Sequence, residues 1–547
     1  MNPPSASNTN IRLSDLPGGE IINREVVLFG FDDRAFPYQR QLQTHLHPGT
    51  GRSLVLRPGA TGAHDQFLRY YGTIIRINGK FHLWYIGSQG QTRVLYVGGA
   101  GPSADDKSLC YATSDDGIHW DKPNLGLVEY KGSKDNNLVD LPARWLAPAA
   151  VVLYEPEDPD PARRYKLVYE VWEKTAVTFN VAFSPDGLRW TPSKLNPVGP
   201  FLEMTGAMKW KGKYYVTGQD NAFVHGPVVS RKLATLVSKD FEHWSPCAAL
   251  GLNRSPDLTG PSREPGYGWA YQDMEEVHVG AGLWNRGNVA LGIYGQWHGH
   301  PTGDRRFVSI DLGLALTHDG LHYVEPIPGF RFIYAREQLE SSPTDGFPAL
   351  VQGQGMENVG DQTYFWYSLW RPGPGTGLRL ATWERDRLGS LQPYHYPRQS
   401  YDAPGNLPQA ISCAVQITQG RVRAFLNASG LGAHASLRVS LLDDTFRPIA
   451  GYSGADAAVV ADASFRAPLT WKQGDVLGES LGEVHLQVEF LGVRPEDARL
   501  HAIHLEPVAE NRGAPQALLQ QDVEQVVFRS VAPFTATLLK PTRELKP

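Results

Sequence analysis

Alternating small and apolar residues, each run closed by a polar turn, recur along the first 390 residues. The strongest copy is CYATSDDGIHW (110–120), in which an Asp-Gly pair marks the turn and a Trp follows. This pattern predicts a strand, a tight hairpin and the start of the next strand. Four weaker copies are VAFSPDGLRW (181–190), TLVSKDFEHW (235–244), LALTHDGLHY (314–323) and RLATWERDRLG (379–389). Five copies predict five similar β units, in which Asp115 and Asp116 shape a turn rather than catalyse.

A second element, an aromatic-rich strand, precedes each turn motif. These strands are FHLWYIG (81–87), YKLVYEVW (165–172), YYVTGQD (214–220), VALGIYGQW (289–297) and TYFWYSLW (363–370). No window shows a sustained helical period. Five units of roughly 55 to 80 residues, with about four strands each, predict a five-bladed β-propeller.

The pattern changes near residue 400. Regular alternation follows, as in RVRAFLNASG, SLRVSLLD and EVHLQVEFLG, with polar turns between. This predicts an antiparallel β-sandwich. We therefore expect an all-β chain with a catalytic propeller and its N-terminal extension in residues 1–400, followed by a β-sandwich in residues 401–547. The first 60 or so residues should supply a strand that closes the ring, together with a long entry loop.

Composition narrows the class of protein. With 41% hydrophobic and 20% charged residues, the 547-residue chain is typical of a soluble globular protein. A net charge of −5 without a long basic run argues against nucleic acid or an anionic membrane as partner. The start MNPPSASNTN lacks the features of a signal peptide, which predicts a cytoplasmic protein, or a secreted or periplasmic one if a signal was removed. A homo-oligomer is compatible with all of this.

The unit SDDGIHWDKPNLG, the five-fold pattern and the C-terminal strings carry a family resemblance. Those strings are RVRAFLNASGLG, SLRVSLLDDTFRPIAGY, TWKQGD and DARLHAIHLEP. Together they resemble five-bladed propeller glycoside hydrolases of the family 32/43 type, and most closely bacterial proteins described as family 32-like. The resemblance implies paired-carboxylate chemistry. Family 32 enzymes place their catalytic residues in WMNDPNG-like, RDP and Glu-Cys motifs, and none of these strings is present here.

Carboxylates in the segments before the aromatic strands are the main chemical signal. A propeller's innermost strands are buried, so a carboxylate there is costly unless it has a function. Clustered carboxylates push one another's pKa values apart, and glycoside hydrolysis uses such a pair. Four of the five segments carry one near the expected axial end: Asp65, Glu203, Glu275 or Glu276, and Glu357.

Roles can be assigned to these carboxylates. We expect Asp65 to be the nucleophile or base, because the first blade supplies it in the resembling families. Glu276 is the expected general acid, with Glu275 in its place if the register is shifted by one. Glu203 and Glu357 are expected to modulate pKa values or bind sugar hydroxyls, unless they form salt bridges to Arg69 or Arg286. The expected substrate contacts are His64, Arg69, Tyr70, Glu275, His278, Arg286, Trp297 and His298.

The sequence therefore predicts a glycoside hydrolase that cleaves a terminal glycosidic bond of an oligo- or polysaccharide. The alternatives are a glycoside phosphorylase, which needs a basic cluster in its pocket, and a carbohydrate-binding propeller without catalysis. No cofactor or metal is expected, although a carboxylate ring could hold a structural Ca²⁺ at the axis.

Overall fold

The structure is a computed structural model, which describes residues 9–13, 21–89, 107–143, 146–173, 176–221, 231–254, 275–300, 307–335, 348–370, 376–394 and 407–508. Strands dominate these residues, and their helical segments are short 3₁₀ turns, so the predicted all-β class is confirmed. The 3₁₀ turns are Pro161–Arg163, Gly454–Asp456, Glu479–Leu481 and Pro495–Asp497. No helix within the described ranges is long and apolar enough to cross a membrane.

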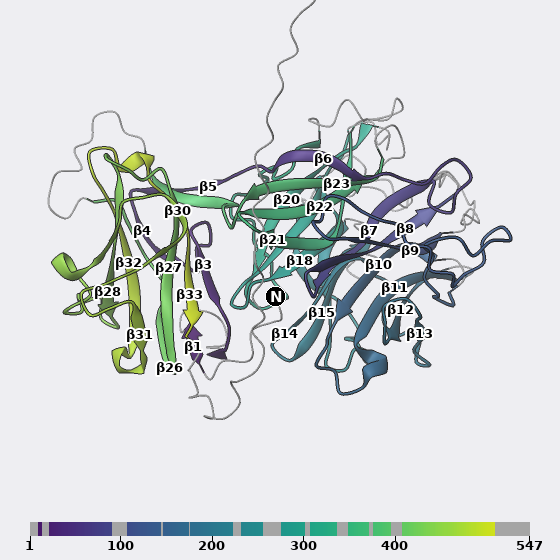
Figure 1. The fold of residues 1–547 in the computed structure, drawn as a ribbon, viewed down its shortest axis with the longest axis horizontal. Coiled ribbons are helices and arrows are strands. Elements are labelled where there is room, and N and C mark those ends of the chain that lie inside the picture. The colour runs from purple at the N-terminus through teal and green to yellow at the C-terminus, as the bar shows by residue number, and fades with distance from the viewer. Residues whose placement is uncertain are drawn as a thin grey trace, which may run out of the picture. The chain divides into compact units, whose positions relative to one another are not determined.

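Five antiparallel groups of strands follow one another along the chain (Figure 1). The first group contains β7 (Phe67–Ile77), β8 (Lys80–Ser88) and β9 (Ser108–Ser114); the second contains β10 (Leu146–Tyr154), β11 (Tyr165–Glu173), β12 (Ala176–Ser184) and β13 (Thr191–Pro192). The third contains β14 (Glu203–Trp210), β15 (Lys213–Asn221), β16 (Arg231–Ser238) and β17 (Ala249–Leu252); the fourth contains β18 (Glu275–Asn285), β19 (Ala290–His298) and β20 (Ser309–Thr317). The fifth contains β21 (Leu350–Val359), β22 (Gln362–Leu369), β23 (Leu378–Glu384) and β6 (Thr50–Leu56).

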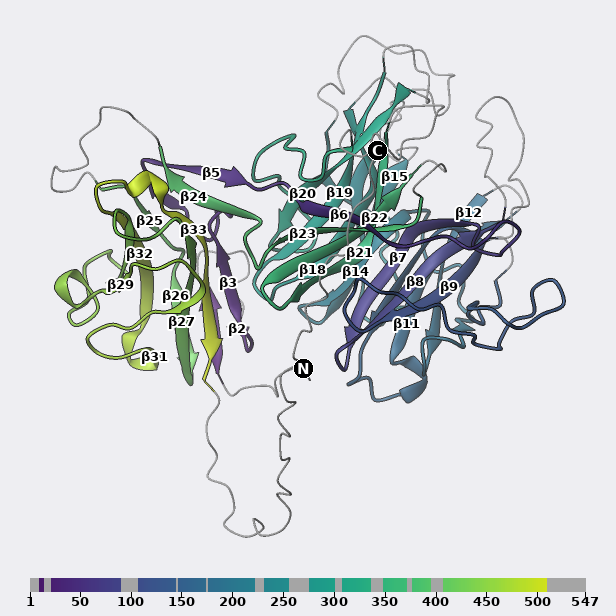
Figure 2. The same cartoon turned by 45° about the horizontal axis from the view of Figure 1, so that its top comes forward.

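The first strands of the five groups contact one another in a closed cycle, in the order β7, β10, β14, β18, β21 and back to β7. Figure 2 shows four of them, β7, β14, β18 and β21, near one another. Their backbones approach closely where glycine removes the side chain. A Cβ atom at Gly206 would lie 2.0 Å from the carbonyl oxygen of Ala281, and one at Gly282 would lie 2.2 Å from that of Gly353. We call these five groups the ring. Strand β6 closes it by pairing with β23, as the sequence predicts for the first 60 residues.

The TSDDGIHW motif forms a turn held by its own polar side chains. Ser114 Oγ accepts hydrogen bonds from the amides of Asp116 and Gly117, at 3.3 and 2.8 Å. Asp116 Oδ1 accepts from the amides of Ile118 and His119, both at 2.8 Å. The same bonds recur at Ser184 with Asp186, Ser238 with Asp240, and Thr317 with Asp319. The side chains of these aspartates therefore stabilise the hairpin turns.

Two further sheets enclose a separate apolar core, and we call them the C-terminal sheet pair. One sheet contains β1 (Asn10–Leu13), β2 (Ile21–Ile22), β4 (Tyr38–Arg40), β25 (Gln409–Ile411), β26 (Val415–Gln419), β28 (Ser436–Asp443), β29 (Ala458–Val460) and β32 (Glu483–Leu491). The other contains β3 (Val26–Phe29), β5 (Leu42–Leu46), β24 (Gly389–Pro393), β27 (Arg421–Ser429), β30 (Ser464–Pro468), β31 (Val476–Gly478) and β33 (Arg499–Pro507).

The sheet pair corrects one expectation about the N-terminal residues. The sequence grouped residues before β6 with the propeller, but β1, β3, β4 and β5 pair with β26, β33, β25 and β24. Strand β24 also lies before residue 400. Short strands carry too little pattern to reveal which sheet they join, because that depends on partners distant in the sequence. The expected sandwich residues 509–547 lie outside the described residues.

Candidate active site

The first strands of the first and fifth groups, β7 and β21, run in the same direction. Strands β21 and β7 form a parallel pair through Gln354 and Thr73, and Thr73 Oγ1 accepts a hydrogen bond from the Val152 amide at 2.9 Å. We call the end at which these strands begin the entrance end, and the other the far end. Asp65 lies two residues before β7, Glu203 begins β14, and Glu275 and Glu276 begin β18. These four carboxylates therefore share the entrance end.

The middle of the ring is crossed by hydrogen bonds. The Gln354 side chain of β21 accepts from the amide of Ala207 at 2.5 Å and donates to its carbonyl oxygen at 2.6 Å. Ala207 belongs to β14, which is not a neighbour of β21 in the cycle, so this pair spans the ring. The Tyr70 hydroxyl donates to the Gln354 carbonyl oxygen at 2.5 Å. Tyr70, an expected substrate contact, is fully buried and helps instead to close the middle of the ring.

Two carboxyl groups meet at the entrance end between the second and third groups. Glu170 of β11 is 2% exposed, and the amide of Met204 donates a hydrogen bond to it. Glu203, the neighbour of Met204, is half-buried and accepts a hydrogen bond from Gln219 Nε2 at 3.1 Å. Burial first, and the charge of Glu203 second, raise the pKa of Glu170 well above its ordinary value. Both effects favour the protonated form of Glu170.

Glu276 has a different environment, although it lies at the same end. It is 3% exposed, and Arg231 Nε of β16 lies 3.6 Å from its Oε2. The Arg231 guanidinium also lies over the Trp297 ring, 4.1 Å from the ring centre. An arginine at this distance suits an ionised carboxylate rather than a protonated one. Trp297 is fully buried, and the centre of its ring lies 5.7 Å from the centre of the His278 ring. Trp297 and His278, both expected as substrate contacts, therefore form part of the wall of the site.

Glu275 faces a hollow of about 280 Å³. His298 bridges two carboxylates there: its Nδ1 lies 2.8 Å from Glu275 Oε2, and its Nε2 lies 2.9 Å from Asp311 Oδ2. Burial alone would lower the pKa of His298, but hydrogen bonds and charges from Asp311 and Glu275 raise it. Burial likewise opposes ionisation of Glu275, but His298 and the charges of Arg254 and Arg331 lower its pKa. The hollow thus presents charged hydrogen-bonding groups.

Asp65 lies in a tight polar cluster at the start of the first group. Its Oδ2 accepts a hydrogen bond from the Tyr85 hydroxyl at 2.8 Å and lies 2.5 Å from Lys122 Nζ. His64 Nε2 lies 2.6 Å from Asn137 Oδ1, and 4.0 Å from Asp65 Oδ1. Asp65 is 2% exposed. Arg69, another expected contact, is the third residue of β7 and half-buried.

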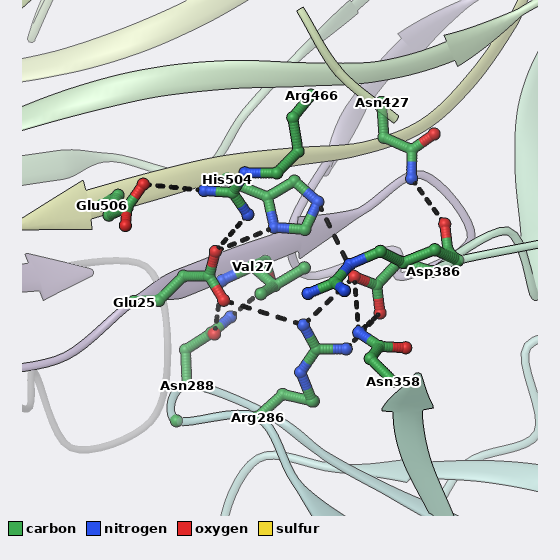
Figure 3. A network of polar contacts seen from close by, with 12 residues as sticks. Glu25, Val27, Arg286, Asn288, Asn358, Asp386, Asn427, Arg466, His504 and Glu506 are labelled. Atoms are coloured by element: carbon green, nitrogen blue, oxygen red, sulfur yellow. Dashed lines mark hydrogen bonds and ion pairs between the residues drawn. The ribbon is translucent and has the colours of Figure 1, made fainter. Parts of the chain in front are cut away.

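Two expected site residues lie at the far end, so their predicted placement is wrong. Glu357 is the eighth residue of β21, three positions beyond Gln354, and Arg286 follows the last residue of β18. Arg286 is paired in a buried network with Asp386 and Glu25 (Figure 3). Glu357 feels the charges of Arg76, Arg286 and Arg385. Arg286 thus forms salt bridges between groups, and Glu357 lies close enough to Arg286 for the arginine's charge to lower its pKa, although burial raises it overall.

Sequence reasoning missed five entrance-end residues, namely Glu170, Arg231, Arg254, Asp311 and Arg331. Two of them carried a signal. Glu170 interrupts the apolar strand YKLVYEVW, and Asp311 interrupts SIDLGLALT. Glu203 and Glu276 were predicted because each is a carboxylate in a buried strand. The same criterion, applied to every strand, would also have identified Glu170 and Asp311. The arginines carried no such signal, because arginine is common at strand ends.

The described ranges contain no group of three or more His, Cys, Asp or Glu side chains arranged to hold a metal ion. The expected alternative of a Ca²⁺ held by four axial carboxylates needs Glu357 beside the others. Glu357 lies at the far end, so that particular ring of ligands does not form.

Comparisons with known proteins give distant matches only. No family model matches the sequence, and no curated protein matches it. Among solved structures, the chain is similar to a glycosyl hydrolase from Bacteroides ovatus (14% identity, 69% of this chain and 97% of that chain, TM-score 0.37). It is also similar to a structure from the GH130 family of mannoside phosphorylases, which contains glycoside hydrolases that target β-1,2 mannosidic linkages in Candida mannan (15%, 62% and 97%, 0.38). A third is an α-L-arabinofuranosidase from Podospora anserina in complex with cellotriose (13%, 62% and 98%, 0.37). At these values we draw nothing about chemistry from them.

Proposed function

We propose that the protein is a carbohydrate-active enzyme that cleaves a glycosidic bond at the entrance end of the ring. One observation carries the proposal: the buried carboxyl Glu170, whose pKa is raised, lies beside Glu203, while Glu276 at the same end lies beside Arg231. Two carboxyl systems held in opposite protonation states are the requirement of glycoside hydrolysis.

We infer that the fold is the predicted five-bladed β-propeller followed by a β-sandwich. The closed cycle of five first strands supports the propeller, and the apolar core shared by the C-terminal sheet pair supports the sandwich. The resemblance to family 32-like proteins rests on the sequence strings alone.

The roles we propose for the carboxyl groups differ from those expected from the sequence. Glu203 is the general acid, because it is half-buried and interacts with Glu170, whose pKa is raised. Because the two groups interact, the proton belongs to the pair, and Glu203 can deliver it to the leaving oxygen. Glu276 is the base or nucleophile, since Arg231 supports its negative charge. Asp65 is hydrogen-bonded to Lys122 and Tyr85 and forms part of the wall of the proposed site.

The hollow at Glu275 is the proposed place for sugar hydroxyls. Its charged His298, Asp311 and Arg331 can each make a charge-assisted hydrogen bond to a hydroxyl group. A hollow of about 280 Å³ that is lined mainly by polar and charged groups suits a single terminal sugar residue better than a long chain. This supports action at a terminal bond.

A glycoside phosphorylase is the second candidate. Its requirement for a basic cluster has support, because Arg231, Arg254 and Arg331 all reach the entrance end. Each of the three is paired with a carboxylate, which leaves less positive charge for a phosphate. We therefore favour hydrolysis. Sugar phosphate formation that depends on added phosphate would select the phosphorylase instead.

The test begins with a panel of chromogenic glycosides, including fructosides, arabinofuranosides, mannosides and galactosides. On a substrate that the wild type cleaves, Glu203→Gln and Glu276→Gln should each lower kcat by at least about 100-fold. The matched control is Glu357→Gln, which changes a half-buried glutamate of the same ring at the far end and should keep full kcat. Full turnover by both entrance variants would contradict the proposed site.

A further inference from the structure

The HGH motif (298–300) places one imidazole ring, that of His298, between two carboxylates of the fourth group. His298 ends β19 and is the register partner of Glu275, which begins the neighbouring strand β18. Asp311 is the third residue of β20, which pairs with the other edge of β19. All three residues line the hollow of about 280 Å³. Three adjacent strands thus supply a carboxylate, an imidazole and a second carboxylate, in that order.

Both ring nitrogens of His298 lie close to a carboxylate oxygen. Nδ1 lies 2.9 Å from Glu275 Oε1 and 2.8 Å from its Oε2. Nε2 lies 2.9 Å from Asp311 Oδ2, which is an ion-pair contact although the two atoms are not aligned for a straight hydrogen bond. A neutral imidazole has one N–H donor and one lone pair, whereas the protonated ring has two donors. In either neutral tautomer, a lone pair would therefore face one of the two carboxylates.

Arginines favour the ionised form of both carboxylates. Arg254 Nη2 lies 3.1 Å from Glu275 Oε2, and Arg331 Nε lies 3.1 Å from Asp311 Oδ2. Burial opposes ionisation of Glu275, but His298 and the two arginines lower its pKa overall. The ring of His298 therefore lies between two negative charges, which stabilise its protonated form. The other titratable residues that line the hollow are His300 and Tyr334.

The two carboxylates differ in how far they are open to a ligand. The Asp311 side chain is 3% exposed, and its Oδ1 accepts a hydrogen bond from the Ala335 amide at 2.6 Å. The Glu275 side chain is 42% exposed, so a ligand in the hollow can reach its oxygens. His298 thus connects an accessible carboxylate to a buried one that the backbone also holds.

We propose that His298 is a positioning residue of this hollow: its protonated ring holds the Glu275 carboxylate in place against buried Asp311, and the hollow loses affinity for its sugar when that proton is released. The inference rests on the proposed function, because it takes the hollow as the place for sugar hydroxyls. In this role His298 acts through Glu275, which accepts from the hydroxyl. The reacting groups Glu203 and Glu276 are not involved.

The direction of the pH effect follows from the state that carries the proton. Burial lowers the pKa of His298, but hydrogen bonds and charges from Asp311 and Glu275 outweigh it, so the pKa lies above the ordinary 6.5. The contacts of the protonated ring are complete below pH 6.5 and are lost as the pH rises through the folded pKa. KM should therefore rise with pH, whereas kcat should not follow this titration.

Nitrogen NMR of the full chain, labelled in its histidine side chains, tests the proton without a substrate. The His298 signals are assigned by their loss in His298→Gln. Both ring nitrogens should be protonated in the acid form, and the midpoint of the titration should lie above 6.5. A midpoint at or below 6.5 would overturn the inference, whether or not the protein cleaves a glycoside.

Steady-state kinetics on a glycoside that the wild type cleaves test the positioning role. Between about pH 6 and about pH 8.5 the wild-type KM should rise at least about tenfold, which is the loss expected for one charge-assisted hydrogen bond. His298→Gln cannot be protonated, so its KM should already be high at the lower pH and should stay level. His298→Lys keeps a cation over this range, so it should restore a low KM at the higher pH. At a given pH, kcat should be similar in all three proteins.

His322→Gln is the matched control. It removes another histidine of the fourth group, which pairs with Asp319 at 2.7 Å in an exposed hairpin turn. Its KM should follow that of the wild type at both pH values. A wild-type KM that does not change with pH, or a wild-type KM in His298→Gln at the lower pH, would contradict the positioning role.

A double-mutant cycle of His298→Gln and Glu275→Gln, measured by urea unfolding, separates this inference from the proposed function. The two residues should be coupled at about pH 6, and the coupling should be lost at about pH 8.5. No coupling at the lower pH would overturn the inference. Full turnover by Glu203→Gln and Glu276→Gln would instead remove the proposed reaction, and would leave the coupling and the NMR midpoint unchanged.

Discussion

The two ends of the ring both bury carboxyl groups, but they treat the charge differently. At the far end, Asp386 accepts two hydrogen bonds from Asn358 at 3.0 Å and pairs with Arg286 (Figure 3). Glu25 lies 2.7 Å from Arg466 Nη1 and 3.3 Å from His504 Nδ1. At the entrance end, burial and the charge of neighbouring Glu203 raise the pKa of Glu170, and the Met204 amide and the charge of Lys107 offset them only in part. Burial alone therefore does not mark a functional carboxyl group; what separates Glu170 from the far-end carboxylates is that its pKa is raised, whereas theirs are lowered.

The pKa directions express this contrast. Burial would raise the pKa of Asp386 and of Glu25, but hydrogen bonds and charges from their partners lower both. At Glu170, burial and Glu203 both raise it. At the far end, Asp386 and Glu25 are therefore held as ionised carboxylates by stabilising partners. At the entrance end, the environment of Glu170 favours the protonated form, which can supply a proton.

Breaking the far-end network should produce the largest loss of stability. Arg286→Met leaves buried Asp386 and half-buried Glu25 without their shared cation, which should lower the free energy of unfolding by about 3–5 kcal/mol. The kcat of the folded fraction should be unchanged. Urea unfolding combined with the glycoside assay measures both quantities. A variant that is as stable as the wild type but inactive would reverse the roles of the two ends.

The pH dependence of stability should have opposite signs at the two ends. The folded pKa of Glu170 is raised above its ordinary 4.5, so its favourable contribution is complete below pH 4.5 and is lost as the pH rises through the folded pKa. Glu170→Gln should therefore gain stability relative to the wild type as the pH rises from 4.5 to neutrality. Unfolding by urea at several pH values measures the difference.

Asp386 is the matched far-end case for that experiment. Its folded pKa lies below the ordinary 3.8, so its contribution is present above that value and is lost as the pH falls through the folded pKa. Asp386→Asn should be destabilising at neutral pH, and the difference from the wild type should shrink on strong acidification. Parallel pH curves for Glu170→Gln and Asp386→Asn would remove the distinction between the ends.

The smallest effect is expected at Glu357. Burial raises its pKa, although Arg76, Arg286 and Arg385 lower it, so the opposing causes partly cancel. Glu357→Gln should change the free energy of unfolding at neutral pH by less than about 1 kcal/mol. Its pH–rate profile should overlay that of the wild type. A shifted profile would mean that Glu357 is coupled to the entrance end after all.

Local patterns revealed most of the fold from the sequence. The Asp-Gly turns and the alternating strands are encoded within about ten residues, so the class, the five units and the structural role of Asp116 could be predicted. The entrance-end positions of Glu203 and Glu276 followed because each stands where its strand begins. Glu357 was misplaced because β21 begins at Leu350, so its glutamate comes near the strand's end.

The remaining features depend on partners distant in the sequence. Glu170 meets Glu203, and Glu276 meets Arg231, only after separate groups of the ring come together. The choice of general acid depended on those contacts, since Arg231 beside Glu276 suits a base. The N-terminal strands likewise join strands about 400 residues away. A single sequence contains no direct record of such pairings.

Infrared difference spectra between the wild type and Glu170→Gln at neutral pH test the central claim most directly. The claim predicts that the wild type has a protonated carboxyl band that the variant lacks. The same comparison for Asp386→Asn should show the loss of an ionised carboxylate band only. Loss of an ionised band on replacing Glu170 would show that the entrance end holds no spare proton, and would contradict the account.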